Sequence, residues 1–440
     1  MTNIATRTLI VGMEIHVELA TNSKMFCGCK NDPFHAPAPN TYVCPVCMGF
    51  PGAIPVANKK AVDWTIKLGL ALGCTIAHES KFDRKHYFYP DLPKGYQISQ
   101  YDQPLCTNGL IHTEFGDVRI TRVHLEEDTA KMIHKTVNGK KVSLIDFNRS
   151  SVPLVEIVSE PDIHSPEQAK AYAKALRDIV RTLGISEANM EQGSMRLEAN
   201  ISMADNPAVL PNYKVEVKNI NSFRFVDHAI AYEMKRHTEL LNAGETPKQE
   251  TLGWNEEKRQ TVSQRTKEDA EDYRYFPDPD LPPMTFTDDA IEALRRELPE
   301  LPQQKAARYV QMGMKEEYAR LVSDPDFPLD MEKLLQCTQT SGLKINDVIG
   351  AIVNSRIKTE EKTEQMIVDE VKASLSFAEV DDTAIENAVQ LVLTTNESAV
   401  VSYKAGKTNV IGFLMGQVMK ELKTKVDPKK VQEIMKKALE

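Results

Sequence analysis

Two close pairs of cysteines stand near the start of this 440-residue chain. Cys27 and Cys29 are one residue apart, Cys44 and Cys47 are two apart, and 14 residues separate the pairs. Four thiolates at this spacing are typical of a tetrahedral zinc site that closes a small loop and leaves no open position for a reaction. We predict a structural zinc. An iron–sulfur cluster is the less favoured alternative, and three further scattered cysteines argue against disulfides.

Residues 82–104 mix aromatic, proline and cationic side chains without the period of a helix or a strand. The segment holds four tyrosines, two phenylalanines, three prolines and four groups that carry or can gain positive charge. Because rings can stack on a flat ligand and cations can contact phosphate, the pattern favours a rigid loop that receives an anionic ligand. A proline-stiffened loop packed on its own aromatics fits the segment equally well when it is taken alone.

Acidic residues and imidazoles form a third group. Glu14 and His16 are two residues apart in an alternating stretch, so their side chains should leave the same face of a strand. Further acids stand in residues 124–128 (HLEED), and Glu156 lies inside an apolar run. Carboxylates with an imidazole could hold Mg²⁺ beside nucleotide phosphates. From spacing alone, structural ion pairs fit slightly better. The arginines available for such pairs are Arg122, Arg149 and Arg196.

Standard nucleotide-binding and hydrolase motifs are missing from the sequence. Residues 405–408 (AGKT) resemble the end of a phosphate-binding P-loop, but the glycine required earlier would be residue 401, which is Val. No HExxH, GxSxG or glycine/serine-rich amidase segment is present. We therefore expect no hydrolase nucleophile in this chain.

The elements that must position these groups are short strands mixed with a few helices up to about residue 290. Residues 7–19, 195–202 and 213–218 alternate apolar and polar side chains, as half-buried strands do. Start and stop signals predict helices at about 59–72, 166–183 and 223–242. Because the order is not a strict βαβ alternation, the pattern predicts an α+β fold with a largely antiparallel sheet.

Helix-forming sequence with Lys/Glu-rich faces dominates the remainder of the chain, and we expect two helical regions there, with a boundary near residue 371. The tail from Tyr403 to Glu440 has nine lysines against four acids. The whole chain has a net charge of −9, which argues against nucleic-acid binding over its entire surface but leaves room for a local basic patch. No apolar run is long enough for a membrane helix or a secretory signal, so we expect a cytoplasmic protein.

One long segment is similar to a family signature. Residues 145–162 (IDFNRSSVPLVEIVSEPD) resemble that of the B subunits of aspartyl/glutamyl-tRNA amidotransferases. The resemblance continues in seven further segments that span nearly the whole chain: 12–18, 82–104, 124–128, 193–200, 217–223, 272–280 and 412–420.

This resemblance implies a ligase of protein biosynthesis that works as a heterotrimer. In that family an amidase-type A subunit frees ammonia from glutamine, while a small C subunit ties the complex together. The B subunit uses ATP and Mg²⁺ to phosphorylate the side-chain carboxylate of misacylated Glu-tRNA(Gln) or Asp-tRNA(Asn), and ammonia then displaces the phosphate. The fold implied is a cradle-like catalytic domain (1–290), a helical domain (291–371) and an all-α tail that touches the tRNA (372–440).

The matched segments also imply which residues act. The resemblance places the catalytic Mg²⁺ on Glu14, His16, Glu127 and Glu156, with Zn²⁺ on the four cysteines and ATP as co-substrate. We expect the ATP and substrate contacts from polar residues of the same segments: Arg84, Lys85, Tyr89, Lys94, Tyr96, Arg196, Glu198, Asn200, Lys218, Asn219 and Asn221.

Two other functions fit parts of the sequence. A free-standing ATP-dependent carboxylate–amine ligase for a small molecule would need no RNA and no basic tail. A non-catalytic, zinc-stabilised tRNA-binding adaptor would use the acids near Glu14 only as ion pairs. The sequence also departs from the family pattern at two places. The helical region at about 315–360 is shortened, and Leu252 stands where an arginine is common.

Overall fold

A computed structural model of the chain describes residues 7–206, 209–266, 272–375, 380–423 and 426–439. The chain divides into two compact units, Met1–Lys305 and Ala306–Glu440. The first unit is built on a sheet of nine strands in the order β14-β13-β12-β11-β1-β10-β7-β6-β2. All neighbouring strands in it are antiparallel except β12 and β13. The predicted α+β class with a largely antiparallel sheet is therefore confirmed.

The strands of the nine-stranded sheet are β1 (Thr8–Glu18), β2 (Thr75–Ile76), β6 (Cys106–Thr113), β7 (Gly116–Glu127), β10 (Pro153–Ser159), β11 (Met195–Ala204), β12 (Val215–Ile220), β13 (Glu250–Asn255) and β14 (Gln260–Thr266). Three small sheets accompany it, made of β15 (Phe276–Pro277), β4 (Asp83–His86) and β5 (Tyr96–Ser99); β16 (Met284–Thr285) and β3 (Glu79–Ser80); β8 (Lys131–Val137) and β9 (Lys140–Asp146).

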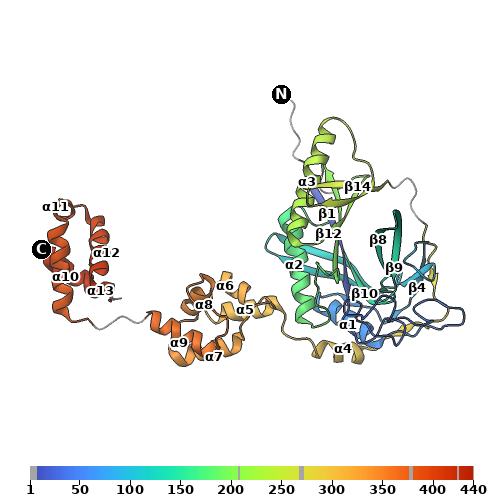
Figure 1. The fold of residues 1–440 in the computed structure, drawn as a ribbon, viewed down its shortest axis with the longest axis horizontal. Helices are drawn as coiled ribbons and strands as arrows, with labels where there is room; N and C mark the ends of the chain where they lie inside the picture. The colour runs from blue at the N-terminus through green and yellow to red at the C-terminus, as the bar shows by residue number, and fades with distance from the viewer. Residues whose placement is uncertain (1–6, 207–208, 267–271, 376–379, 424–425, 440) are drawn as a thin grey trace. The chain divides into compact units, whose positions relative to one another are not determined.

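The two faces of the large sheet differ in character because side chains alternate along each strand. Ile15 of β1 lies opposite Ile157 of β10 and Leu197 of β11, and all three are buried in the hydrophobic core of the unit. Helices α1 (Lys59–Ala71), α2 (Pro166–Thr182) and α3 (Phe223–Asn242) pack their apolar sides on this face (Figure 1). The opposite face carries the alternate residues, which include Glu14, His16 and Glu156.

The three helices begin where the sequence predicts. Asn58, Ser165 and Ser222 occupy the N-cap positions, and each side chain accepts a backbone N–H of the first turn. A fourth helix, α4 (Asp288–Arg296), buries Ile291 in the same core. The first unit therefore extends beyond the division expected at residue 290.

The second unit is helical and has two separate cores. One core includes Tyr309 to Val371 and the other Ile385 to Leu439. Helix α9 runs to Leu375, so the boundary expected near residue 371 falls inside a helix. Among the described residues, no helix is both long and apolar enough to cross a membrane. The helices of this unit are α5 (Pro302–Gln311), α6 (Glu316–Val322), α7 (Met331–Ser341), α8 (Ile345–Val353), α9 (Glu364–Leu375), α10 (Asp382–Thr395), α11 (Glu397–Lys404), α12 (Ile411–Leu422) and α13 (Pro428–Leu439).

The core face of β10 should dominate the stability of the first unit. Replacing the fully buried Ile157 by Ala leaves a cavity in the middle of the sheet and should cost about 2–5 kcal/mol. Both tryptophans, Trp64 and Trp254, lie in this unit, so urea unfolding followed by tryptophan fluorescence reports on it alone. The exposed Leu144→Ala change is the control and should cost about 0.5 kcal/mol. Equal losses in the two variants would contradict this account of the core.

Candidate active site

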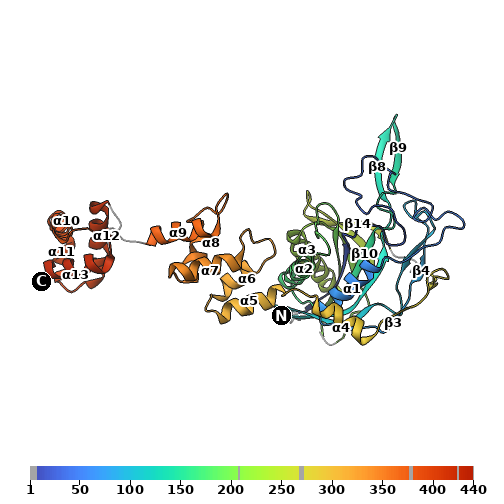
Figure 2. The ribbon, with the colours of Figure 1, turned by 90° about the horizontal axis from the view of Figure 1, so that it is seen from below.

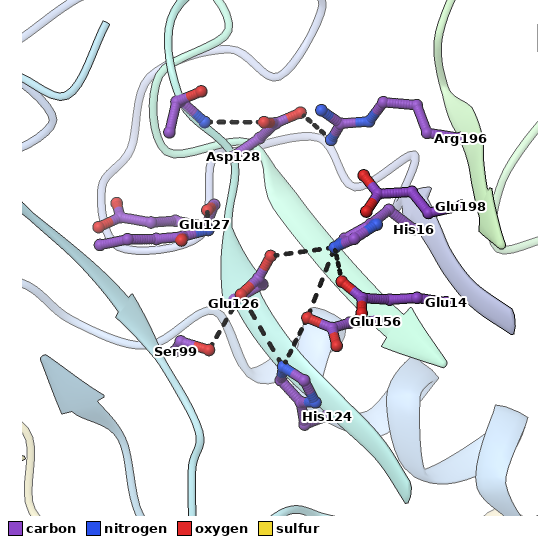
Figure 3. A network of polar contacts seen from close by, with 12 residues as sticks. Glu14, His16, Ser99, His124, Glu126, Glu127, Asp128, Glu156, Arg196 and Glu198 are labelled. Carbon is purple, nitrogen blue, oxygen red and sulfur yellow. Dashed lines mark hydrogen bonds and ion pairs between the residues drawn. The ribbon is translucent and has the colours of Figure 1, made fainter. Parts of the chain in front are cut away.

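The polar face of the sheet gathers an acid–imidazole cluster, which consists of Glu14, His16, His124, Glu126 and Glu156 (Figure 3). The strand register creates it, because Glu156 of β10 lies opposite His16 of β1 on one side and His124 of β7 on the other. Its carboxylate Oε2 is 3.5 Å from His16 Nε2 and 3.2 Å from His124 Nε2. Glu156 is thus the centre of the cluster.

The two outer acids complete the arrangement. His16 Nε2 is 3.8 Å from Glu14 Oε1 and 3.9 Å from Glu126 Oε1. Ser99 of β5 donates a 2.9 Å hydrogen bond to Glu126 Oε2. Two overlapping groups have ligand atoms that lie within 4.8 Å of one another: Glu14, His16 and Glu156, and His124, Glu126 and Glu156. Either group could hold a cation.

Burial makes the charges of this cluster depend on one another. Burial and the charge of Glu156 raise the pKa of Glu14 to about 7. Burial alone would raise the pKa of Glu156 as well, but His124 and His16 hold it well below its usual range. Burial alone would lower the pKa of His124, and Glu156 and Glu126 instead raise it to about 9. Three carboxylates around one point, one of them hard to ionise, are the charge pattern that a divalent cation relieves.

Three of the four residues predicted to bind magnesium meet in this cluster, and Glu127 does not. It has the opposite parity on β7, so its carboxylate leaves the other side of the strand. There it pairs with Lys94 and accepts the backbone N–H of Ile98 at 3.0 Å. Glu126, which the sequence analysis passed over, occupies the cluster instead. Strand parity was the signal available, because Glu126 shares it with His124.

A second charged group adjoins the first and is made of ion pairs. Arg196 donates to Asp128 Oδ2 at 2.6 Å, and Arg149 Nε is 3.6 Å from the same oxygen. Burial alone would raise the pKa of Asp128, but the two arginines lower it to about 2. Arg122 lies 3.6 Å from Glu156. The arginines considered from sequence as ion-pair partners do pair with acids, two of them outside the acid–imidazole cluster.

The aromatic segment 82–104 packs largely on residues 273–280. The rings of Tyr101 and Tyr275 stack with centroids 4.3 Å apart. Arg84 donates to Asp278 at 2.6 Å and lies over the ring of Tyr96. Much of this segment is therefore satisfied internally, as the alternative interpretation of the sequence expected.

Lys85 is different from its neighbours. Its ammonium lies over the ring of Tyr273 at 5.0 Å and, within the described part of the chain, has no carboxylate at ion-pair distance. Burial alone would lower its pKa, but Glu126, Tyr275 and Glu156 raise it. Lys85 is thus a half-buried cation that faces the acid–imidazole cluster without touching it.

The remaining predicted contacts are dispersed. Lys218 is 2.9 Å from Glu198, which lies opposite Glu14 on the neighbouring strand. Asn200 lines a cavity of about 270 Å³ near Gly12, and Asn221 lines another of about 430 Å³ beside Arg177. Lys94 is paired as described above. Tyr89 and Asn219 are exposed.

The four predicted zinc ligands do come together. The sulfur atoms of Cys27, Cys29, Cys44 and Cys47 all lie within 4.8 Å of one another. The buried Lys24 has its ammonium 3.9 Å from Cys47 Sγ, where it would offset the charge of a tetrathiolate site. A hydrogen bond from the Cys27 thiol is the main cause that lowers the pKa of Cys47, to about 5. The donor set and its surroundings fit a structural metal.

Comparison with known proteins identifies close relatives. A family model described as "GatB/GatE catalytic domain" matches residues 9–292, and one described as "GatB domain" matches residues 328–439. A protein of Dehalococcoides mccartyi is 44% identical over 485 aligned positions, one of Thermomicrobium roseum 42% over 483, and one of Thermotoga maritima 41% over 477. In each case 98% of both chains is covered. All three are named as the B subunit of an aspartyl/glutamyl-tRNA(Asn/Gln) amidotransferase, and the alignments exceed the 440 residues of this chain because the relatives are longer.

We expect one zinc ion per chain in protein purified without chelator. Cys44→Ser should lose the metal and several kcal/mol of stability, because the binding free energy of a structural site contributes to folding. Cys337→Ser, in the second unit, should keep it. Metal analysis by mass spectrometry and thiol titration measure both. Finding iron would favour the cluster alternative, and finding neither metal with four freely titratable thiols would contradict the assignment.

The Asp128–Arg196 pair should act on stability rather than on metal binding. A carboxyl whose pKa is lowered on folding contributes stability above its unfolded pKa of about 3.8, and this contribution fades as the pH falls towards 2. Asp128→Asn should therefore lose at least about 2 kcal/mol at neutral pH, with a smaller deficit near pH 3. The exposed Asp289→Asn protein should follow the wild type. A deficit that does not change with pH, in tryptophan-monitored unfolding, would contradict this.

Proposed function

This chain belongs to the GatB family of aspartyl/glutamyl-tRNA amidotransferase B subunits, and on that premise we propose that its acid–imidazole cluster activates a carboxylate carried by misacylated tRNA. The family resemblance seen in the sequence is thereby confirmed. The proposed reaction is the ATP-dependent phosphorylation of the side chain of Glu-tRNA(Gln) or Asp-tRNA(Asn). Ammonia from a glutaminase subunit then amidates the activated acyl group.

The chemistry explains why such a site needs charge rather than a nucleophile. A carboxylate oxygen is a poor leaving group, and transfer of the γ-phosphoryl group of ATP onto it produces an acyl phosphate and ADP. Ammonia attacks the acyl carbon, inorganic phosphate leaves, and the amide remains on the tRNA. Phosphoryl transfer depends mainly on positioning and on neutralising negative charge. The missing hydrolase motifs agree with ammonia being made in another chain.

The acid–imidazole cluster is the observation that carries the proposal. When bound, Mg²⁺ would neutralise phosphate charge, and Glu14, His16, Glu126 and Glu156 would hold it. Glu126 takes the place that the sequence analysis gave to Glu127, because its carboxylate is in the cluster. His124, at 3.2 Å from Glu156, would orient that carboxylate. These roles follow from the contacts of the chain's own residues.

Lys85 fits the transferring phosphoryl group. It is a half-buried cation without a carboxylate partner in the described part of the chain, and it faces Glu126 and Glu156, so an anion between them would be attracted to it. Glu198 and Lys218 border the cluster and stay in the proposal as substrate contacts. Arg84, Lys94 and Arg196 each have an acidic partner, which makes them better suited to shaping the site.

The partners follow from the family name and from charge. We assign the chain to a heterotrimer in which the other two members are an amidase-type A subunit, the source of ammonia, and a small C subunit. The lysine-rich helices around the last hydrophobic core are proposed to bind tRNA phosphate. Zn²⁺ on the four cysteines is proposed as structural. A small-molecule ligase would turn over ATP without tRNA, and an adaptor would not turn over ATP at all.

The reconstituted complex tests the site through tRNA-dependent ADP formation. Glu126→Gln and Glu156→Gln keep the side-chain size but remove charge, and each should lower the rate by on the order of 100-fold at similar melting temperature. Glu127→Gln should retain phosphorylation to within about 10-fold, because its carboxylate faces Lys94.

Two results would change the assignment. A severe loss in Glu127→Gln with a mild one in Glu126→Gln would restore the original metal ligand. Near-normal rates in a destabilised Glu156→Gln protein would make the cluster structural, because breaking a buried ion pair mainly costs stability. The wild-type enzyme with and without misacylated tRNA separates the competing functions.

A further inference from the structure

The hairpin β8–β9 stands apart from the nine-stranded sheet as a two-stranded sheet of its own. Its turn residues Asn138 and Gly139 both have positive φ, 50° and 76°, as the tight hairpin turn that matches strand twist requires. Figure 2 shows the hairpin projecting from the rest of the first unit. Two-stranded hairpins are marginally stable alone, so an exposed one calls for a reason.

One face of the hairpin is aliphatic and uncovered. The register places Ile133 opposite Leu144, and Val142 and Val137 share their face. Leu144 is 46% exposed and Val137 is 44% exposed. None of the four belongs to a hydrophobic core of the described chain. The other face is more polar, with His134 hydrogen-bonded to Ser143 and with Thr136 beyond it.

The same hairpin is basic within an acidic chain. Its lysines are not engaged in ion pairs with any part of the chain that the structure describes; they are Lys131, Lys135, Lys140 and Lys141. Its one acid, Asp146, accepts the backbone N–H of Asn40. Against a net charge of −9, this segment presents positive charge around an aliphatic centre. Charge complementarity therefore asks for an acidic partner with an apolar centre.

The base of the hairpin is fixed to the cysteine loop. Asn40 accepts the backbone N–H of Phe147 at 2.7 Å, and Asn148 accepts those of Thr41 and Tyr42, both at 2.8 Å. Lys24, beside the cysteines, donates to the carbonyl of Phe147. The hairpin also connects β7 to β10, the two strands that carry His124, Glu126 and Glu156. Whatever binds the hairpin is held by elements that lead into the acid–imidazole cluster.

We propose that the β8–β9 hairpin is the docking arm for an acidic surface of the ammonia-supplying subunit. The proposal rests on the proposed function, which requires such a partner near the catalytic acids. A protein fits better than RNA because the hairpin has four aliphatic side chains on one face but no Phe, Tyr, Trp or Arg to stack on bases. A second copy of the hairpin is disfavoured because the lysines would repel each other.

Direct binding of the ammonia-supplying subunit to the full-length chain, in the presence of the small third subunit, tests the proposal. Ile133→Ser with Leu144→Ser should weaken the dissociation constant by about 100-fold, about 10-fold for each aliphatic contact. Lys135→Glu with Lys140→Glu should weaken it as well and should reduce the salt dependence of association. Thr136→Ala, on the opposite face, is the matched control and should bind normally. The charge-reversal pair leaves the aliphatic residues intact and guards against a folding defect in the first pair.

Activity gives a second readout. Both pairs should lower amidation driven by glutamine while amidation driven by added ammonium persists, since the catalytic acids are untouched. An unchanged affinity for the ammonia-supplying partner in both pairs would overturn the proposal, as would weakened tRNA binding with a normal affinity for that partner. Absence of ammonium-driven activity in the wild type would count against the proposed function alone, because the binding measurement does not depend on it.

Discussion

The burial of the Glu156 carboxylate in the middle of a large sheet is the constraint around which the first unit is organised. A buried carboxylate is costly unless it is paired or bound to a cation, and β10 has strands on both sides. The register therefore supplies an imidazole from each neighbour, His16 from β1 and His124 from β7. A shift by one residue in either pairing would turn one imidazole to the helical side and leave the charge without its partner.

The same alternation separates stability from chemistry. Val155 and Ile157 flank Glu156 in sequence and face the hydrophobic core, where α1, α2 and α3 cover them. The rigid packing of that face fixes the positions of the polar side chains on the other face to a fraction of an ångström. A site that must place phosphate and carboxylate groups benefits from being built on strands rather than on loops.

The cysteine loop extends this rigidity to a region that has little core of its own. Backbone and side-chain hydrogen bonds from residues 38–41 and Lys24 hold residues 145–148. Those residues lead directly into β10. A structural metal among the cysteines would thus act on the catalytic strand through the loop, at a distance from the chemistry and without contact with substrate.

Much of this protein followed from sequence patterns that are local. Alternation defined β1 and β11, cap residues marked the starts of α1, α2 and α3, and the cysteine spacing named the four ligands. Long ordered motifs gave the family. Such features depend on the backbone period and on the chemistry of neighbours along the chain, so one sequence suffices to see them.

Only the tertiary structure decided which acids meet. Glu126 and Glu127 are adjacent in sequence and chemically the same, yet strand pairing directs one to His16 and His124 and the other to Lys94. It likewise decided that Arg84 pairs with Asp278, nearly two hundred residues away, while Lys85 has no such partner among the described residues. These outcomes depend on register and on long-range packing, and no local pattern carries that information.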